Sequence, residues 1–103
     1  MKNKVLVQLI VPYLESKYDL FIPINKRIGN VIELLCKMLN EITNGLYNEN
    51  SDDKKLYNAV TGEMYNIQDL VRKTNIRNGS KIVLLWQKKI HISLCESFLF
   101  TKI

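Results

Sequence analysis

Residues 28–42 read IGNVIELLCKMLNEI, and this stretch decides the fold. Its apolar residues recur at intervals of three and four, which places them in one stripe along a helix. They are Ile28, Val31, Ile32, Leu35, Met38, Leu39 and Ile42. The polar residues of the opposite face are Asn30, Glu33, Lys37, Asn40 and Glu41. The pattern predicts an amphipathic helix over residues 26–43, capped by the side chain of Asn25 and ended by Asn44 and Gly45.

Two strands are predicted before this helix. The apolar run over residues 5–11 is rich in β-branched side chains and stops at Pro12, which cannot donate to a β-ladder, so we expect a well-buried strand. In the next segment, one face carries Tyr18, Leu20 and Ile22 and the other carries Asp19 and Phe21. This alternation is typical of a strand. Because only residues 13–16 separate the two segments, they should pair as an antiparallel hairpin.

After the helix, residues 46–54 are polar and turn-forming, which indicates an exposed loop. Two short strands are predicted over residues 55–60 and 63–66, around the turn at Thr61 and Gly62. A helical turn is expected over residues 67–74. The dipeptide Asn78-Gly79 then predicts a tight turn before a strand over residues 81–86. The order indicates an α+β protein in which a mixed sheet of four or five strands packs on one long helix, as in the β-grasp fold.

Several segments between Lys4 and Trp86 resemble known ubiquitin-like proteins. Residues 28–31 and 75–82 are similar to the helix start and to the last turn of ubiquitin. Residues 18–23, 31–35 and 76–84 resemble the YukD/EsaB family more closely. Members of that family are small ubiquitin-like proteins of type VII secretion loci in Gram-positive bacteria. The resemblance implies a ubiquitin-like domain over residues 1–86 that acts as an accessory or adaptor protein through protein–protein contacts.

The C-terminal residues 87–103 fit no part of this resemblance. The chain ends Phe100-Thr101-Lys102-Ile103 and not in Gly-Gly, so we expect no conjugation through the C-terminus. Ile90, Ile92 and Leu94 alternate like a strand, and residues 98–100 are apolar. This extension is expected to add a strand to the sheet edge, to pair with another copy in a homo-oligomer, or to be the remnant of a longer protein or a cloning junction.

The last strand suggests a binding surface. If Ile82 and Leu84 face the helix, then Val83 and Leu85 point outward, and Phe21 joins them on the outer face of the sheet. We expect Phe21, Val83 and Leu85 to bind a protein partner. Two alternatives are that the extension or a second subunit covers these residues, or that they are exposed without a function.

The composition limits the other function classes. A chain of 103 residues with a net charge of +5 has the size of one domain, and its charges are dispersed along the sequence as singles and pairs. A solvated surface explains this dispersion, so we expect no nucleic-acid partner, although a small basic nucleic-acid-binding domain is the alternative function. A toxin or effector domain is a third class. No apolar run approaches a membrane span, and no signal peptide is recognisable, so a cytoplasmic protein without membrane insertion is expected.

Chemistry-bearing residues are few. Cys36 and Cys95 lie far apart in apolar runs, which predicts two buried thiols and neither a disulfide nor a zinc site. His91 lies four residues before Cys95, but a catalytic dyad or a metal site needs further groups that no spacing supplies. The glycines are dispersed and form no phosphate loop. We therefore expect no enzyme activity, no cofactor and no metal.

Overall fold

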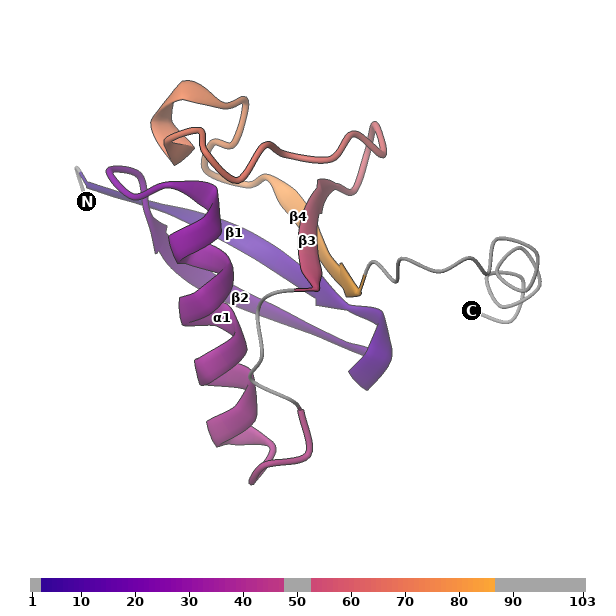
Figure 1. The fold of residues 1–103 in the computed structure, drawn as a ribbon. Coiled ribbons are helices and arrows are strands. Elements are labelled where there is room, and N and C mark those ends of the chain that lie inside the picture. Colours follow the sequence, from indigo (N-terminus) through magenta and orange to yellow (C-terminus); the bar gives the residue numbers. More distant parts are fainter. Residues whose placement is uncertain (1–2, 48–52, 87–103) are drawn as a thin grey trace.

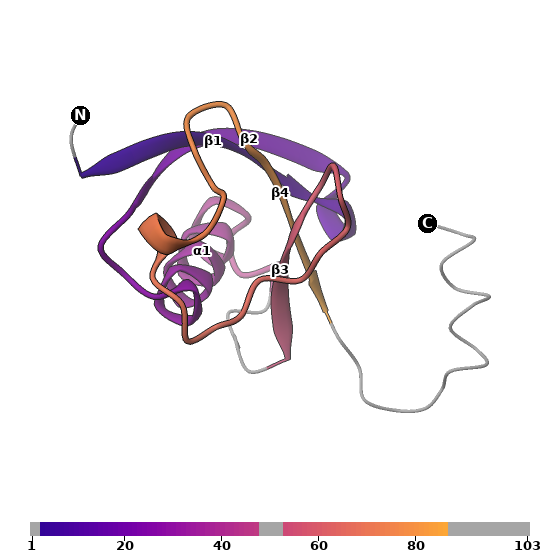
Figure 2. The same ribbon diagram turned by 90° about the horizontal axis from the view of Figure 1, so that it is seen from above.

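The computed structural model describes residues 3–47 and 53–86. Its sheet has four strands in the order β2-β1-β4-β3. The central strands β1 (Lys4–Val11) and β4 (Lys81–Trp86) run parallel, while β2 (Ser16–Pro23) and β3 (Lys54–Asn58) flank them in antiparallel pairs. The one α-helix of the described residues, α1 (Ile28–Ile42), crosses one face of the sheet (Figure 1). Seen from above, α1 lies within the curve of the sheet (Figure 2). The mixed sheet on one helix confirms the predicted fold class.

The opening hairpin forms as the sequence predicts. Strands β1 and β2 pair over their full lengths, and a short 3-10 turn, η1 (Pro12–Leu14), joins them. Glu15 closes this turn in the left-handed conformation, with φ of 53°. The prediction that the first strand is well buried holds for one face only. Val7 and Val11 are buried but Leu6 is 41% exposed, because α1 covers a single face of the sheet.

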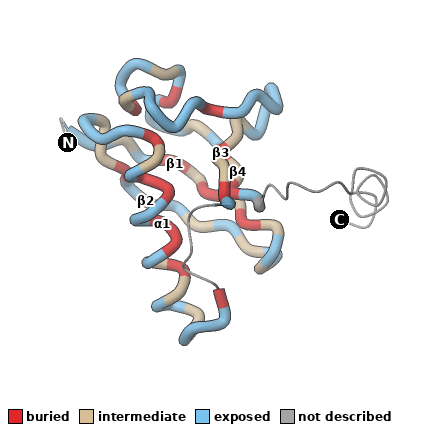
Figure 3. Tube along the Cα trace, viewed as in Figure 1, coloured by how far each residue is buried: buried red, intermediate tan, exposed pale blue. Residues whose placement is uncertain are grey.

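Helix α1 supplies most of the core. Six of its residues are buried, and they are Ile28, Val31, Ile32, Leu35, Cys36 and Leu39. They join the inward residues of β1 and β4 in one apolar cluster (Figure 3). The predicted stripe is therefore confirmed, as is burial of the Cys36 thiol. Ile42, at the end of the stripe, is 53% exposed because the last turn of α1 projects past β3 and β4 (Figure 1).

The start of α1 differs from the prediction. Asn25 does not cap the helix: Arg27 occupies the N-cap position, and no side chain caps there. Instead, the Ile28 N–H donates to the Asp69 carbonyl at 2.8 Å, and the Gly29 N–H donates to the Ile67 carbonyl at 3.0 Å. Backbone carbonyls far along the chain thus satisfy N–H groups that have no partner within a helix. At the other end, Asn44 and Gly45 adopt positive φ, as predicted for the stop.

The second half of the chain forms fewer strands than the maximum predicted. Residues 63–66 make an isolated bridge between Tyr57 and Met64, so the fifth predicted strand is absent from the described sheet. The predicted helical turn shortens to a 3-10 turn, η2 (Val71–Lys73). Gly79 has φ of 90° in the turn before β4, a conformation that glycine adopts without steric cost.

The expected exposed loop over residues 46–54 lies partly outside the described residues, and within the described part Leu46 is exposed as predicted, whereas Tyr47 and Lys54 are not. Tyr47 and Lys54 are only 2% and 1% exposed. The Asn40 side-chain amide donates to the Tyr47 carbonyl at 2.6 Å, and the Tyr47 ring packs edge-on against Tyr13 with centroids 5.9 Å apart. The Lys54 ammonium lies 5.2 Å from the Tyr47 ring centroid and 3.7 Å from the Asp53 carboxylate. An aromatic face and an opposite charge therefore compensate the burial of this lysine.

Two adjacent leucines of α1 provide a matched test of this packing. Leu35 is 4% exposed and Leu34 is 49% exposed. Leu35→Ala should lower the free energy of unfolding by about 2–5 kcal/mol, because it leaves a cavity in the core. Leu34→Ala should change it by less than about 1 kcal/mol. Urea denaturation measures both, and equal losses would contradict the assigned faces.

The buried Tyr47 predicts a loss of stability in alkali. Burial raises the pKa of the Tyr47 phenol above its ordinary value of 10.0. Above about pH 10 the unfolded chain therefore releases this proton while the folded chain retains it, so the free energy of unfolding falls as the pH rises. Tyr47→Phe should remove about 1 kcal/mol of the loss seen between about pH 9 and pH 11.

The control for this experiment is Tyr57→Phe, on the opposite face of the sheet. Urea midpoints at each pH provide the measurement. If the two variants show the same pH dependence as the natural chain, Tyr47 does not keep its proton on folding.

Candidate functional site

The outer face of the sheet, opposite α1, carries the residues that the sequence assigns to partner binding. Ile82 and Leu84 are buried under the helix, as predicted. Val83, between these two residues, is half-buried, and Leu85, which follows Leu84, is 37% exposed. Phe21 is 51% exposed on β2. The predicted orientation of all three side chains follows from the alternation of their strands.

The strand register divides this face into two apolar groups. A polar row crosses the sheet between them, because Gln8 of β1 lies opposite Asp19 on one side and beside Lys81 on the other. Phe21 lies on one side of this row, whereas Val83 and Leu85 lie on the other. The structure thus brings two of the three predicted residues together and separates the third.

The first group is a cross-strand pair near the start of β1. Phe21 lies directly opposite Leu6, and both side chains are exposed, Leu6 by 41%. Leu6 also holds the turn before β4, since its carbonyl accepts the Gly79 N–H at 2.8 Å and its N–H donates to the Asn78 side chain at 2.8 Å. The position of this pair is therefore fixed from both neighbouring segments.

The second group spans three strands, and we call it the apolar centre. It consists of Ile10, Tyr57, Val83 and Leu85. Val83 lies beside Ile10 on β1 and opposite Tyr57 on β3. Lys17 pairs with Ile10, and Lys55 pairs with Leu85, so lysines border the centre on both sides. An apolar centre with a charged rim is the usual composition of a protein-binding surface.

Sequence reasoning missed three members of this face, namely Leu6, Ile10 and Tyr57. The alternation of β1 and β3 contains the signal that would have assigned them outward. What the sequence does not contain is the register between strands that are distant in the chain. That register decides which outward residues become neighbours.

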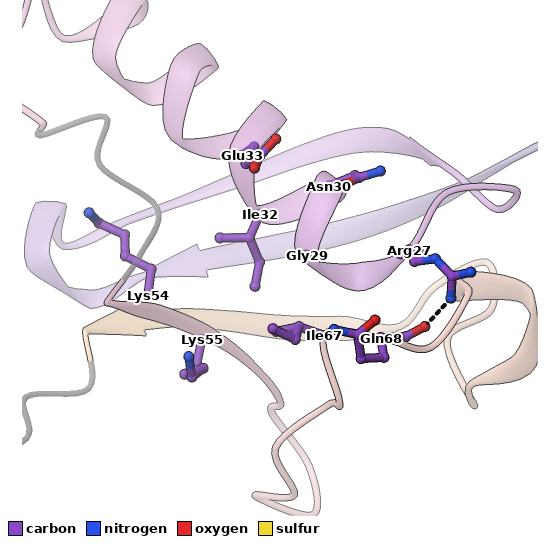
Figure 4. Close-up of a pocket in the computed structure, with 9 residues that line it drawn as sticks. All are labelled: Arg27, Gly29, Asn30, Ile32, Glu33, Lys54, Lys55, Ile67 and Gln68. Atoms are coloured by element: carbon purple, nitrogen blue, oxygen red, sulfur yellow. Dashed lines mark hydrogen bonds between the residues drawn. The ribbon is translucent and has the colours of Figure 1, made fainter.

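A pocket of about 290 Å³ lies on the other side of the molecule, between the first turns of α1, β3 and residues 67–68 (Figure 4). The Arg27 guanidinium closes one end by donating to the Gln68 carbonyl at 2.5 Å. Beside this contact, Gly29 lies close to Ile67, because an added Cβ would be 3.3 Å from the Ile67 carbonyl oxygen. Glu33 is the one carboxylate of the lining, which contains neither histidine nor cysteine. The pocket therefore assembles no recognisable acid–base or nucleophilic pair.

Over residues 3–47 and 53–86, no three histidine, cysteine or carboxylate side chains gather as metal ligands. No helix in this part of the chain has the length and apolar character of a membrane span. His91 and Cys95 lie outside the described residues, as does the expected strand-like segment around Ile92.

Comparison with known proteins identifies the fold. No family model matches the sequence, and no curated protein matches it. Among solved structures, ubiquitin of Caldiarchaeum subterraneum is 17% identical with a TM-score of 0.63, over 82% of this chain and 95% of that protein. The N-terminal ubiquitin-like domain of the 4931431F19Rik protein is also 17% identical, with a TM-score of 0.60 over 86% of this chain and 80% of that one.

A third similar structure is a chain of the ESX-5 inner membrane complex in its MycP5-free form. It is 15% identical with a TM-score of 0.67 over 97% of this chain, but this chain spans only 27% of that one. Identities this low carry information about the fold alone. Together with one helix packed on a mixed four-stranded sheet, these likenesses show that the chain has the ubiquitin-like β-grasp fold.

Proposed function

We propose that this chain is a non-catalytic, cytoplasmic adaptor that binds a protein component of a type VII secretion system through the outer face of its sheet. The apolar centre is the observation that carries the proposal. It places Val83 of β4 between Ile10 of β1 and Tyr57 of β3, with Leu85 two residues further along β4. Tyrosine is among the residues that most often dominate the energetics of a protein interface when it lies in the middle of the patch, and burial of the aliphatic side chains around it adds apolar contact area.

The rim favours a partner with carboxylates around an apolar contact. Lys17, Lys55 and Lys81 lie next to the apolar centre in the strand register, whereas Asp19 is the carboxylate of this face. Charges at an interface rim mainly steer association and select the partner. Phe21 with Leu6 would form a second contact of the same interface, beyond the polar row. The contact is therefore proposed to be apolar in its middle and electrostatically selective at its edge.

Two likenesses support the secretion part of the proposal. Residues 18–23 and 76–84 resemble the YukD/EsaB family, and a chain of the ESX-5 inner membrane complex contains a part with this fold. The absence of a recognisable catalytic pair in the pocket beside α1 favours a binding role. We further propose that residues 87–103 form a separate extension through which the chain pairs with another copy.

The test replaces either of two residues of the apolar centre, Val83 or Leu85, with glutamate. Tagged natural chain, Val83→Glu and Leu85→Glu are expressed in the source cell and purified at low and high salt, and the bound proteins are quantified by mass spectrometry. A component of a type VII secretion complex should accompany the natural chain. Its recovery should fall by about tenfold or more with either variant, because a charge buried in an interface weakens binding strongly.

Val60→Glu is the matched control, since Val60 is 82% exposed in the turn after β3 and lies outside the strands that form the outer face. This variant should recover the partner as well as the natural chain does, and thermal midpoints should show that all variants fold. Recovery of nucleic acid at low salt alone, without a secretion protein, would contradict the proposal and favour the nucleic-acid-binding alternative. If Val83→Glu recovers the partner as well as the natural chain does, the outer face of the sheet is not the partner-binding surface.

A further inference from the structure

The fold gathers six exposed cationic side chains that are dispersed along the sequence. They are Lys4, Lys26, Arg27, Arg72, Lys73 and Arg77. Backbone hydrogen bonds join the segments that carry them: the Val71 N–H donates to the Lys26 carbonyl at 2.9 Å, and the Arg72 N–H donates to the Ile24 carbonyl at 3.0 Å. Ile24 in turn donates to the Asn3 carbonyl, next to Lys4. We call this region the basic end; it lies at the top of Figure 1.

The charge of the basic end is not neutralised within the described part of the chain. Asp69 is the carboxylate that lies on its segments, and none of the six cations forms an ion pair within residues 3–47 and 53–86. Elsewhere in these ranges, five lysines face six carboxylates. The positive charge is therefore dispersed along the sequence, as expected, but it is concentrated in space.

Two of the three arginines of this end, Arg27 and Arg77, donate part of their guanidinium groups to the backbone. The Arg27 Nη1 donates to the Gln68 carbonyl, and the Arg77 Nη1 donates to the Thr74 carbonyl at 2.7 Å and to the Ile76 carbonyl at 2.8 Å. Part of each guanidinium fork is thereby committed to the backbone, which reduces its capacity for bidentate recognition of one phosphate or carboxylate.

We propose that the basic end binds peripherally to an anionic phospholipid surface. A compact cluster of exposed Lys and Arg suits such a surface, where each cation near the headgroups strengthens binding by about fivefold. A single-stranded nucleic acid is the less favoured partner, because proteins that bind it without sequence preference usually add stacking aromatic rings. The exposed aromatic residues of the described chain, Tyr13 and Phe21, lie on η1 and on the outer face instead.

The basic end lies away from the apolar centre of the proposed partner site, although Lys4 lies two residues before Leu6 of its second contact. Ile10 lies six positions after Lys4 on β1, which corresponds to about 20 Å along the strand. The apolar centre around Val83 would therefore stay accessible while the basic end contacts headgroups. The inference thus goes beyond the adaptor proposal, and each can fail without the other.

Flotation of the full chain with vesicles tests the inference. One set of vesicles contains equal parts of phosphatidylglycerol and phosphatidylcholine, and the other contains phosphatidylcholine alone. The natural chain should bind the anionic vesicles only, and less strongly as salt increases. The double variant Arg72→Glu/Lys73→Glu should weaken binding by about tenfold or more, because both charges are reversed at the surface.

The control is Lys17→Glu/Lys37→Glu, which changes the net charge equally at exposed positions outside the basic end. It should bind within about twofold of the natural chain, as should Leu85→Glu, whose side chain belongs to the partner site. Equal weakening by the two double variants would overturn the inference, since net charge alone would then explain binding. The inference is also overturned if the chain does not bind the anionic vesicles, or if soluble glycerol phosphate competes fully with them. Tighter binding to a DNA duplex or to polyglutamate at the same salt would overturn it as well.

Discussion

The packing of one helix on one face of a four-stranded sheet determines which side chains of this molecule are buried and which point outward. Helix α1 buries Ile32 and Leu39 against the face of the sheet that carries Ile82 and Leu84. A strand side chain that does not point to the helix must point to the opposite face, where the described chain supplies no second layer. The described residues therefore leave the outward positions of β1, β3 and β4 without a second layer. In the proposed adaptor, an apolar residue at such a position, for example Leu85, contributes to the partner-binding surface.

A second constraint acts at the start of α1. Its first N–H groups are satisfied by the carbonyls of Ile67 and Asp69, which lie some forty residues along the chain. This backbone cap draws residues 67–73 against the loop that precedes the helix. The same contacts bring Arg72 and Lys73 beside Lys26 and Arg27. The capping of the N-terminus of α1 and the concentration of positive charge therefore have the same structural cause. Gly29 permits the approach, because a larger residue would press on the Ile67 carbonyl.

Periodicity was sufficient to predict the elements that bury one apolar face. The helix, the hairpin and strand β4 all have strong local patterns. The dipeptide Asn78-Gly79 is typical of tight turns, so the turn before β4 was also predictable. Features that depend on distant contacts could not be predicted. The side-chain cap expected from Asn25 is replaced by backbone carbonyls of residues 67 and 69. Residues 46–54 are mostly polar, so their composition gave no sign that Tyr47 and Lys54 are buried. At the outer face, orientation was predictable from alternation, whereas the separation of Phe21 from Val83 depends on register.

The central claim is that the outer face of the sheet is open while the inner face is closed, and solution NMR with a water-soluble paramagnetic agent tests it most directly. Methyl signals of Ile82 and Leu84 should be protected from relaxation, whereas those of Leu6 and Leu85 should broaden strongly in the full-length chain. Leu34 provides an exposed reference on the helix. Protection of Leu85 to the same degree as Leu84 would contradict the account, because the outer face would then already be covered.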